Sequence, residues 1–236
     1  AVLPVFILAG RWAESRAKHR GGDALRTLMS LGTKTACLMD GAKKATGLGG
    51  REIAIDVETL RVGDIVKVLP GEYYVDNQDL LIMTTLGSCI AACIWDRERH
   101  IGGLNHFMLP EGSGDSGRYG SYAMEMLINE LLKRGASRAS LEAKVFGGGA
   151  VVSGMNSINV GERNTRFVLD YLKTEHIPVV SKDVMDIYPR KVCFLPASGK
   201  AMVKKLACAN TEALLAQERA AAVKPSASAG GSVDLF

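Results

Sequence analysis

The order of the apolar segments constrains the fold more than any other feature of this chain. Short apolar runs that favour strands are interrupted by two longer segments with helical spacing, residues 119–134 and 162–175. The first helical segment carries Met124, Leu127 and Ile128 on one face. Strands are predicted at residues 80–84, 89–95, 101–109, 141–146, 178–182, 191–195 and 201–206. Strand runs followed by helix–strand units predict an α/β fold, a layered α/β sandwich with a mixed β-sheet.

A cysteine and a histidine lie within these strand runs. Cys89 follows Gly87 and Ser88 where one apolar run gives way to the next, and His106 lies further on in another strand-like run. A thiol at a Gly-flanked strand end and an imidazole on a nearby strand are the parts of a Cys–His nucleophilic site, in which an imidazolium stabilises the thiolate. The alternative is that Cys89 packs as a small buried hydrophobic residue.

The backbone around the cysteine supplies a further candidate element. Backbone N–H groups of Gly87 and Ser88 would stabilise an oxyanion, and Gly87 would allow a close backbone approach and an unusual φ. The alternative for Gly87 is an ordinary turn glycine. Asn105 flanks the histidine and points the other way on a strand, so a structural hydrogen bond is expected for it.

Composition and charge narrow the class of protein. The chain has 236 residues, enough for one or two domains, of which 47% are hydrophobic and 23% charged, as in globular proteins. The net charge of +4 is too small to indicate nucleic-acid binding, and no apolar run approaches the roughly 20 residues that span a bilayer. The five cysteines include no Cys-x-x-Cys pair, so no metal site or disulfide framework is predicted, and the expected location is the reducing cytoplasm.

Several segments resemble, in order, the chemoreceptor glutamine deamidase family CheD. The segment from Thr84 to Cys93 and the Gly-Gly-Leu-Asn-His-Phe-Met-Leu-Pro segment that contains His106 carry the resemblance around the predicted site. Further similar segments lie at residues 66–75, 144–149, 159–164, 188–192 and 230–236. The resemblance therefore covers about residues 66–236.

The resemblance implies a protein-glutamine glutaminase. Its substrates would be methyl-accepting chemotaxis receptors, in which Gln side-chain amides become Glu with release of ammonia. Cys89 would attack the carboxamide carbon, and His106 would protonate the departing ammonia and then activate water against the thioester. Such a reaction requires no cofactor, and none is predicted.

The family also implies a threonine shortly before the cysteine that orients the histidine. Both Thr84 and Thr85 stand near that place. Side chains alternate along a strand, so Thr85, rather than Thr84, is predicted to share a face with Cys89 and to be the third catalytic residue. The alternative is that Thr85 is a β-branched residue that only favours the strand.

Two further segments of the resemblance lie outside the Cys–His pair. The triglycine at residues 147–149 lacks the spacing and the lysine of a P-loop, and it is predicted to be a backbone loop near the active site. Arg163 and Asn164 would either contact a receptor helix or cap a helix of this chain, and the sequence does not choose between these roles.

The first 65 residues differ from the rest of the chain. A Gly-Arg-Trp…Glu-Ser-Arg-Ala-Lys segment is helix-prone, residues 51–57 alternate like a strand, and Val-Gly-Asp-Ile-Val and Pro-Gly-Glu sequences follow. These segments resemble the entry to the actuator domain of heavy-metal-transporting P-type ATPases. The Asp-Lys-Thr-Gly phosphorylation sequence and the Thr-Gly-Glu loop are missing, so no ATPase activity is expected.

The two resemblances together predict a chimera. Residues 1–65 would be a helix-plus-strand N-terminal extension without activity, residues 66–222 a CheD-like deamidase domain and residues 223–236 a flexible C-terminal tail. The alternative is that the first 65 residues are an unusual extension native to the deamidase. A second hypothesis for function is a binding or regulatory module, because the family is similar to proteins that bind a CheC-type phosphatase.

Overall fold

The computed structural model describes residues 35–40, 51–56, 60–61, 63–78, 80–112, 116–151, 160–207 and 216. The chain divides into two units, Ala1–Lys34 and Thr35–Phe236, and every described residue belongs to the second. The helix predicted near the N-terminus and the tail predicted at residues 223–236 lie outside the described residues.

The described strands form two sheets. In chain order they are β1 (Thr35–Asp40), β2 (Arg51–Asp56), β3 (Ile65–Lys67), β4 (Tyr73–Asp76), β5 (Leu81–Leu86), β6 (Ile90–Asp96), β7 (Ile101–Asn105), β8 (Leu141–Gly147), β9 (Val179–Val184), β10 (Arg190–Leu195) and β11 (Lys200–Lys205). The six-stranded sheet has the order β11-β10-β5-β3-β1-β2, and the five-stranded sheet has the order β4-β7-β6-β8-β9. Both sheets are mixed, because β3 pairs with β5 and β8 with β9 in parallel, while the other pairs are antiparallel.

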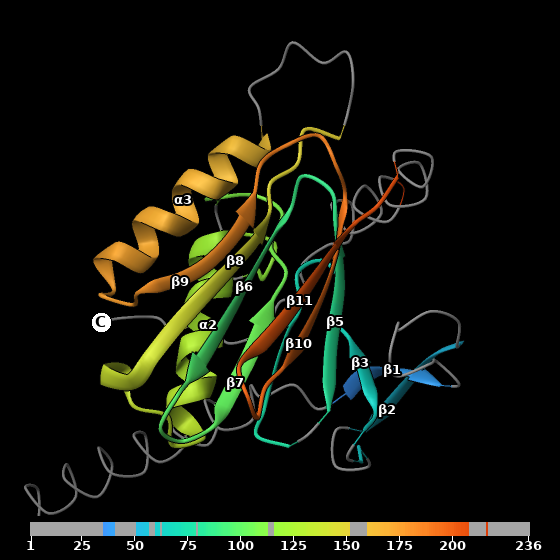
Figure 1. Cartoon of the computed structure of the whole chain (residues 1–236), viewed down its shortest axis with the longest axis vertical. Helices are drawn as coiled ribbons and strands as arrows, with labels where there is room; N and C mark the ends of the chain where they lie inside the picture. The colour runs from blue at the N-terminus through green and yellow to red at the C-terminus, as the bar shows by residue number, and fades with distance from the viewer. Residues whose placement is uncertain are drawn as a thin grey trace, which may run out of the picture. The chain divides into compact units, whose positions relative to one another are not determined.

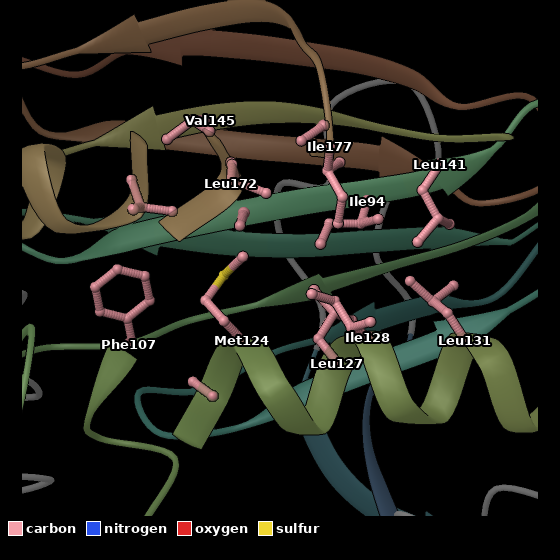
Figure 2. Packing of buried hydrophobic residues seen from close by; sticks show 14 of the residues in the cluster. Ile94, Phe107, Met124, Leu127, Ile128, Leu131, Leu141, Val145, Leu172 and Ile177 are labelled. Carbon is pink, nitrogen blue, oxygen red and sulfur yellow. The ribbon is translucent and has the colours of Figure 1, made fainter. Parts of the chain in front are cut away.

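Two helices cover one face of the five-stranded sheet (Figure 1). They are α2 (Gly120–Lys133) and α3 (Val160–Thr174), and a 3₁₀ turn, η2 (Arg138–Ser140), precedes β8. The apolar stripe of α2 packs onto strand residues such as Ile94 and Val145, and Figure 2 shows Met124, Leu127 and Leu131 pointing at the sheet. The helical period therefore buries this stripe, as the sequence predicts.

A second hydrophobic cluster fills the space between the two sheets. The six-stranded sheet contributes Val66, Ile82, Leu86, Val192 and Phe194, and the five-stranded sheet contributes Tyr74, Ala91, Cys93, Leu104 and Phe146. Strand β6 is therefore covered on both faces, with alternate side chains in the helix cluster and in the inter-sheet cluster. This explains why its sequence is a continuous apolar run instead of an alternating one.

Gly135 terminates helix α2, as predicted, two residues after Lys133. Gly135 has a φ of 97° and donates its N–H to Leu132 O, while the N–H of Ala136 bonds to Leu131 O. These two bonds are those of a Schellman motif, in which glycine occupies the left-handed position at no steric cost.

The prediction of a layered α/β sandwich is confirmed, and the helices and most strands lie within two or three residues of their expected bounds. Three differences matter. The mixed strands form two sheets instead of one, and β1 and β4 have no counterpart among the predicted strands, while β3 corresponds only to the Val-Gly-Asp-Ile-Val sequence. The strand predicted at residues 101–109 ends at Asn105. Beyond Asn105, Phe107 forms an isolated bridge with Ile90 and Leu109 forms one with Tyr119.

The strands of the N-terminal segment belong to the larger sheet. β1 pairs with β2 and also with β3, which lies at the predicted seam between the two resemblances. Ala36 and Leu60 are buried in the inter-sheet cluster. Strands β1 and β2 therefore share one sheet with β3 and β5, and Ala36 and Leu60 share the inter-sheet cluster with them.

Candidate active site

Backbone pairing brings Cys89 and His106 to the same face of the five-stranded sheet. Ile90 and Phe107 exchange two backbone hydrogen bonds of 3.0 Å, and this bridge keeps the antiparallel register of β6 with β7. Cys89 and His106 each precede one member of the bridge, so they are diagonal neighbours across the pair. Diagonal neighbours on one face lie within reach of long side chains.

That face points into the space between the two sheets. Ile90 and Phe107 belong to the cluster under the helices, whereas Cys89 and Met108 belong to the inter-sheet cluster. Cys89 and His106 are each 1% exposed. The candidate nucleophile and the candidate base are therefore both enclosed between the sheets.

A threonine of the opposite sheet holds the imidazole. Thr84, on β5, has its Oγ1 at 2.9 Å from His106 Nδ1 and at 2.8 Å from the carbonyl oxygen of Val68. The hydroxyl has a single proton, and Val68 O can only accept. The arrangement without opposed acceptors has Thr84 donating to Val68 O and His106 Nδ1–H donating to Thr84. The unprotonated nitrogen of His106 is then Nε2, the tautomer that a general base requires.

The structure corrects the choice between the two threonines. Ile82, Thr84 and Leu86 point into the inter-sheet space, whereas Leu81 and Met83 belong to a separate cluster on the other face of the sheet. Thr85 alternates onto that other face and is partly exposed. The prediction that Thr85 shares a face with Cys89 is wrong, because it extended the alternation of β5 to Cys89. Strand β5 ends at Leu86, and the chain bends at Gly87 and Ser88.

Burial determines the charge of the histidine. Desolvation lowers the pKa of His106 to about 3, more than the backbone carbonyl of Val68 raises it. The imidazole is therefore neutral at pH 7, and not the imidazolium that the sequence analysis expects. Within the described residues, Nε2 is buried and has no hydrogen-bond partner. The geometry thus provides an unoccupied acceptor on the face that Cys89 shares.

A tight turn fixes the backbone of the histidine. Pro70 and Gly71 occupy the centre of a turn closed by the bond from Glu72 N–H to Leu69 O, with φ of 86° at Gly71. His106 donates its N–H to Glu72 O at 2.9 Å and accepts from Gly71 N–H at 2.7 Å. The Pro-Gly-Glu sequence, which entered the sequence analysis only as a resemblance, therefore supports His106 directly.

Three consecutive carbonyl groups at the cysteine are each held by a donor. Gly87 O accepts from Gly149 N–H at 2.9 Å, and Cys89 O accepts from Gly148 N–H at 2.8 Å. Between them, Ser88 O accepts from Asn164 Nδ2 on α3 at 3.2 Å. The peptide planes around Cys89 are therefore held by two other parts of the chain.

The triglycine at residues 147–149 lies against this loop, as predicted. A Cβ on Gly147, whose φ is 113°, would lie 2.2 Å from Cys89 O, and one on Gly148 would lie 2.3 Å from Thr165 Oγ1. Side chains at these positions would therefore push the loop away. Gly87 itself is not among the described glycines with positive φ. The glycines with positive φ near this loop are Gly147 and Gly148.

The two asparagines near the site differ in role. Asn105 accepts from Ala92 N–H at 3.0 Å and donates to Ala123 O at 3.1 Å, which ties β7 to β6 and α2. This is the structural hydrogen bonding expected for Asn105. Asn164 is fully buried and donates to the carbonyl groups of Ser88 and Met108, so neither of its expected roles, receptor contact or helix cap, describes its contacts. Its contact with Ser88 spans 76 residues of sequence, and no local signal reveals it.

The structure describes three cysteines besides Cys89. Cys37, Cys93 and Cys193 are free thiols, and burial raises the pKa of Cys93 despite the nearby Lys144. Among the residues that the structure describes, no group of three or more His, Cys, Asp or Glu side chains could hold a metal ion. In that same part of the chain, no helix is long and apolar enough to span a bilayer.

Known sequences resemble this chain over most of its length. Residues 108–205 match the family described as CheD chemotactic sensory transduction. A "Probable chemoreceptor glutamine deamidase CheD 1" from Albidiferax ferrireducens is 64% identical over 177 residues, which cover 73% of this chain and 76% of the relative. Similar proteins named "Probable chemoreceptor glutamine deamidase" occur in Janthinobacterium sp., 55% identical over 73% of this chain and 89% of the relative, and in Dechloromonas aromatica, 56% identical with the same coverage. At these identities and coverages, the chain belongs to the CheD family.

Proposed function

We propose that this chain is a chemoreceptor glutamine deamidase, which converts Gln side chains of methyl-accepting chemotaxis receptors to Glu and ammonia. The observation that carries the proposal is the contact between Thr84 and His106, which leaves Nε2 as the acceptor on the face that bears Cys89. The names of the related proteins support the substrate class.

The proposed reaction has two halves. Cys89 sulfur forms a bond to the carboxamide carbon, its proton passes to His106 Nε2, and the carbonyl oxygen becomes an oxyanion. The oxyanion collapses, the C–N bond breaks, and His106 returns the proton to the departing nitrogen, which leaves as ammonia. His106 then takes a proton from water as the water attacks the thioester, and collapse releases the Glu side chain and the Cys89 thiol. The balance is amide plus water to acid plus ammonia, with no cofactor in any step.

Backbone N–H groups complete the proposed site. Those around Gly87 and Ser88 remain the candidates for stabilising the oxyanion, and Thr84 replaces Thr85 as the proposed third catalytic residue. A neutral His106 fits this scheme, because it can accept the thiol proton while the bond from sulfur to carbon forms. A preformed thiolate–imidazolium pair is then not required.

The surface next to the loop of the nucleophile suits a protein substrate. Met185, Ile187 and Tyr188 are exposed. The segment that carries them bonds to the triglycine from Met185 N–H to Gly147 O and to the residue after it from Ala150 N–H to Asp186 O. Exposed apolar side chains near a buried site favour a protein contact. We assign this contact to the receptor, in the cytoplasm. Binding of a CheC-type phosphatase is a second candidate use of the same surface, and it predicts that Cys89→Ala retains phosphatase binding.

For the N-terminal segment we propose an origin in a P-type ATPase actuator domain and no activity of its own. The proposal predicts that a chain shortened to begin at Val66 keeps its deamidase activity if it folds. Loss of activity in a folded, shortened chain would contradict it. Because β1 pairs with β3, we expect the shortened chain to be less stable than the full one.

The experiment for the main proposal measures ammonia release and the Gln-to-Glu mass change on a chemoreceptor cytoplasmic fragment. We expect Cys89→Ala to abolish both signals. Cys93→Ala is the matched control, because Cys93 is equally buried, belongs to the same inter-sheet cluster and is not part of the proposed site. Absence of activity in the folded parent chain, or equal activity in Cys89→Ala, would refute the proposal.

A further inference from the structure

Asn164 occupies a position where packing alone does not require an amide. It lies on α3 and is fully buried, on the face of the helix that also buries Val168 and Leu172. Desolvating an amide costs free energy unless hydrogen bonds replace the lost water, and leucine has a similar size. The amide is therefore expected to serve its hydrogen-bond partners.

Both partners of this amide are backbone carbonyls of the proposed site. Asn164 Nδ2 donates to Met108 O at 2.8 Å and to Ser88 O at 3.2 Å. Ser88 directly precedes the nucleophile, and Met108 follows His106 by two residues. The last backbone pair between the two segments is the bridge of Ile90 with Phe107. Beyond this bridge, Met108 and Leu109 donate their N–H groups to Arg118 O instead. Asn164 therefore joins the two catalytic segments where their own pairing stops.

The orientation of the amide follows from the same contacts. A flipped side chain would place Oδ1 against two carbonyl oxygens, so Nδ2 must face Ser88 and Met108. Within the described residues, Oδ1 is then buried without a hydrogen-bond partner. Burying an acceptor without a partner lowers the free energy of unfolding. The amide at this position therefore combines one unfavourable contact with two hydrogen bonds to the catalytic segments.

The bond to Ser88 has a consequence for the nucleophile. Ser88 C=O and Cys89 N–H belong to one peptide unit, and the described residues contain no cis peptide bond. In a planar trans peptide the two groups point in opposite directions. A donor that fixes the direction of Ser88 O therefore also fixes the direction of Cys89 N–H.

We infer that Asn164 is a positioning residue for the deamidase reaction, which holds the Ser88–Cys89 peptide so that the N–H of Cys89 is directed at the developing oxyanion. The inference rests on the proposed function. The bonds from Gly148 and Gly149 to this loop come from backbone, whereas the bond from Asn164 comes from a side chain. A substitution of Asn164 therefore removes a restraint on the loop without changing the triglycine.

The test compares Asn164→Leu with the parent chain in two reactions of Cys89. Deamidation forms an oxyanion, whereas alkylation by iodoacetamide displaces iodide and forms none. We expect kcat for deamidation to fall roughly tenfold to 100-fold, below the effect of deleting a whole oxyanion donor, with KM changed less than about twofold. The rate of Cys89 alkylation should remain within about twofold of the parent rate, because the thiol and His106 are untouched.

The matched control is Leu172→Ala, which removes buried contacts of the same helix away from the loop of the nucleophile. It should lose stability and keep kcat. Equal kcat in Asn164→Leu and Leu172→Ala would overturn the inference, and so would equal losses of deamidation and alkylation. If Asn164→Leu does not fold, Asn164→Ser provides the same two rates, because its short hydroxyl cannot reach both carbonyls. An inactive parent chain would refute the proposed function, whereas an active parent with an unaffected Asn164→Leu refutes only this inference.

Discussion

Replacement of Thr84 by valine removes one hydroxyl and keeps the β-branched shape that suits a strand. In the folded chain that hydroxyl accepts from His106 Nδ1–H at 2.9 Å and donates to Val68 O at 2.8 Å. Thr84 is fully buried, so water does not replace the lost contacts. The variant therefore leaves a buried donor and a buried acceptor without their partners.

The size of the effect follows from these two contacts. An unsatisfied buried donor costs about 1–3 kcal/mol, and here that cost falls on the Nδ1–H tautomer, the one that leaves Nε2 free to accept a proton. At about 1.4 kcal/mol per tenfold change, the active tautomer loses roughly 5- to 150-fold in population relative to the inactive one. We therefore expect kcat/KM for deamidation to fall by roughly this factor, with KM little changed. The orphaned Val68 carbonyl should also lower the free energy of unfolding by about 1 kcal/mol or more.

The assay is initial-rate ammonia release on the receptor fragment, with the folded fraction checked by circular dichroism. Two variants serve as controls. Thr84→Ser restores a hydroxyl and should recover most of the activity, and Thr85→Val changes the neighbour on the opposite face and should keep the parent rate. Parent-like activity in folded Thr84→Val, or a larger loss in Thr85→Val, would refute the assignment of the third residue.

Two further predictions concern stability. Gly147→Ala should lower the free energy of unfolding in chemical denaturation by more than Gly135→Ala does, and it should also reduce kcat. Both glycines have positive φ, but of the two only Gly147 would carry a Cβ that meets Cys89 O, at 2.2 Å. Equal losses in the two variants would show that backbone strain alone matters at Gly147. His106 is neutral in the fold because burial lowers its pKa to about 3, whereas the unfolded chain takes up a proton near pH 6.5, so stability should fall as the pH drops from about 6.5 to about 3. Urea midpoints across this range should decline less steeply for His106→Gln, and identical slopes would contradict a buried neutral histidine.

Much of the fold could be predicted from the pattern of apolar residues. The apolar stripe of α2 shows the helical period, β6 and β8 appear as apolar runs of strand length, and Gly135 marks the helix end. β4 was not predicted, since it has only four residues and follows a turn directly. The division into two sheets also could not be read from the pattern, because pairing partners are chosen by contacts between distant segments.

In the site, too, the sequence pattern does not reveal contacts between distant segments. Cys89 and His106 were predicted from residue type and from their places near strand ends, and the structure places them on one face. The choice of Thr85 failed because alternation holds only within a strand, and the chain leaves β5 at Gly87. The roles of Glu72 and Asn164 depend on hydrogen bonds between segments that periodicity does not relate.

The restraint on the Ser88 carbonyl has a consequence for the order in which the protein acquires activity. Thr84, Cys89 and His106 leave the ribosome early, but Asn164 follows Ser88 by 76 residues. At about 5–20 residues per second, roughly 4–15 s separate their synthesis. During this interval the nascent chain carries the thiol and the imidazole without the helix that we infer directs the peptide between Ser88 and Cys89. The proposed amide hydrolysis would thus depend on completion of the fold, and an unfinished chain would expose neighbouring proteins to a cysteine but not to an assembled site.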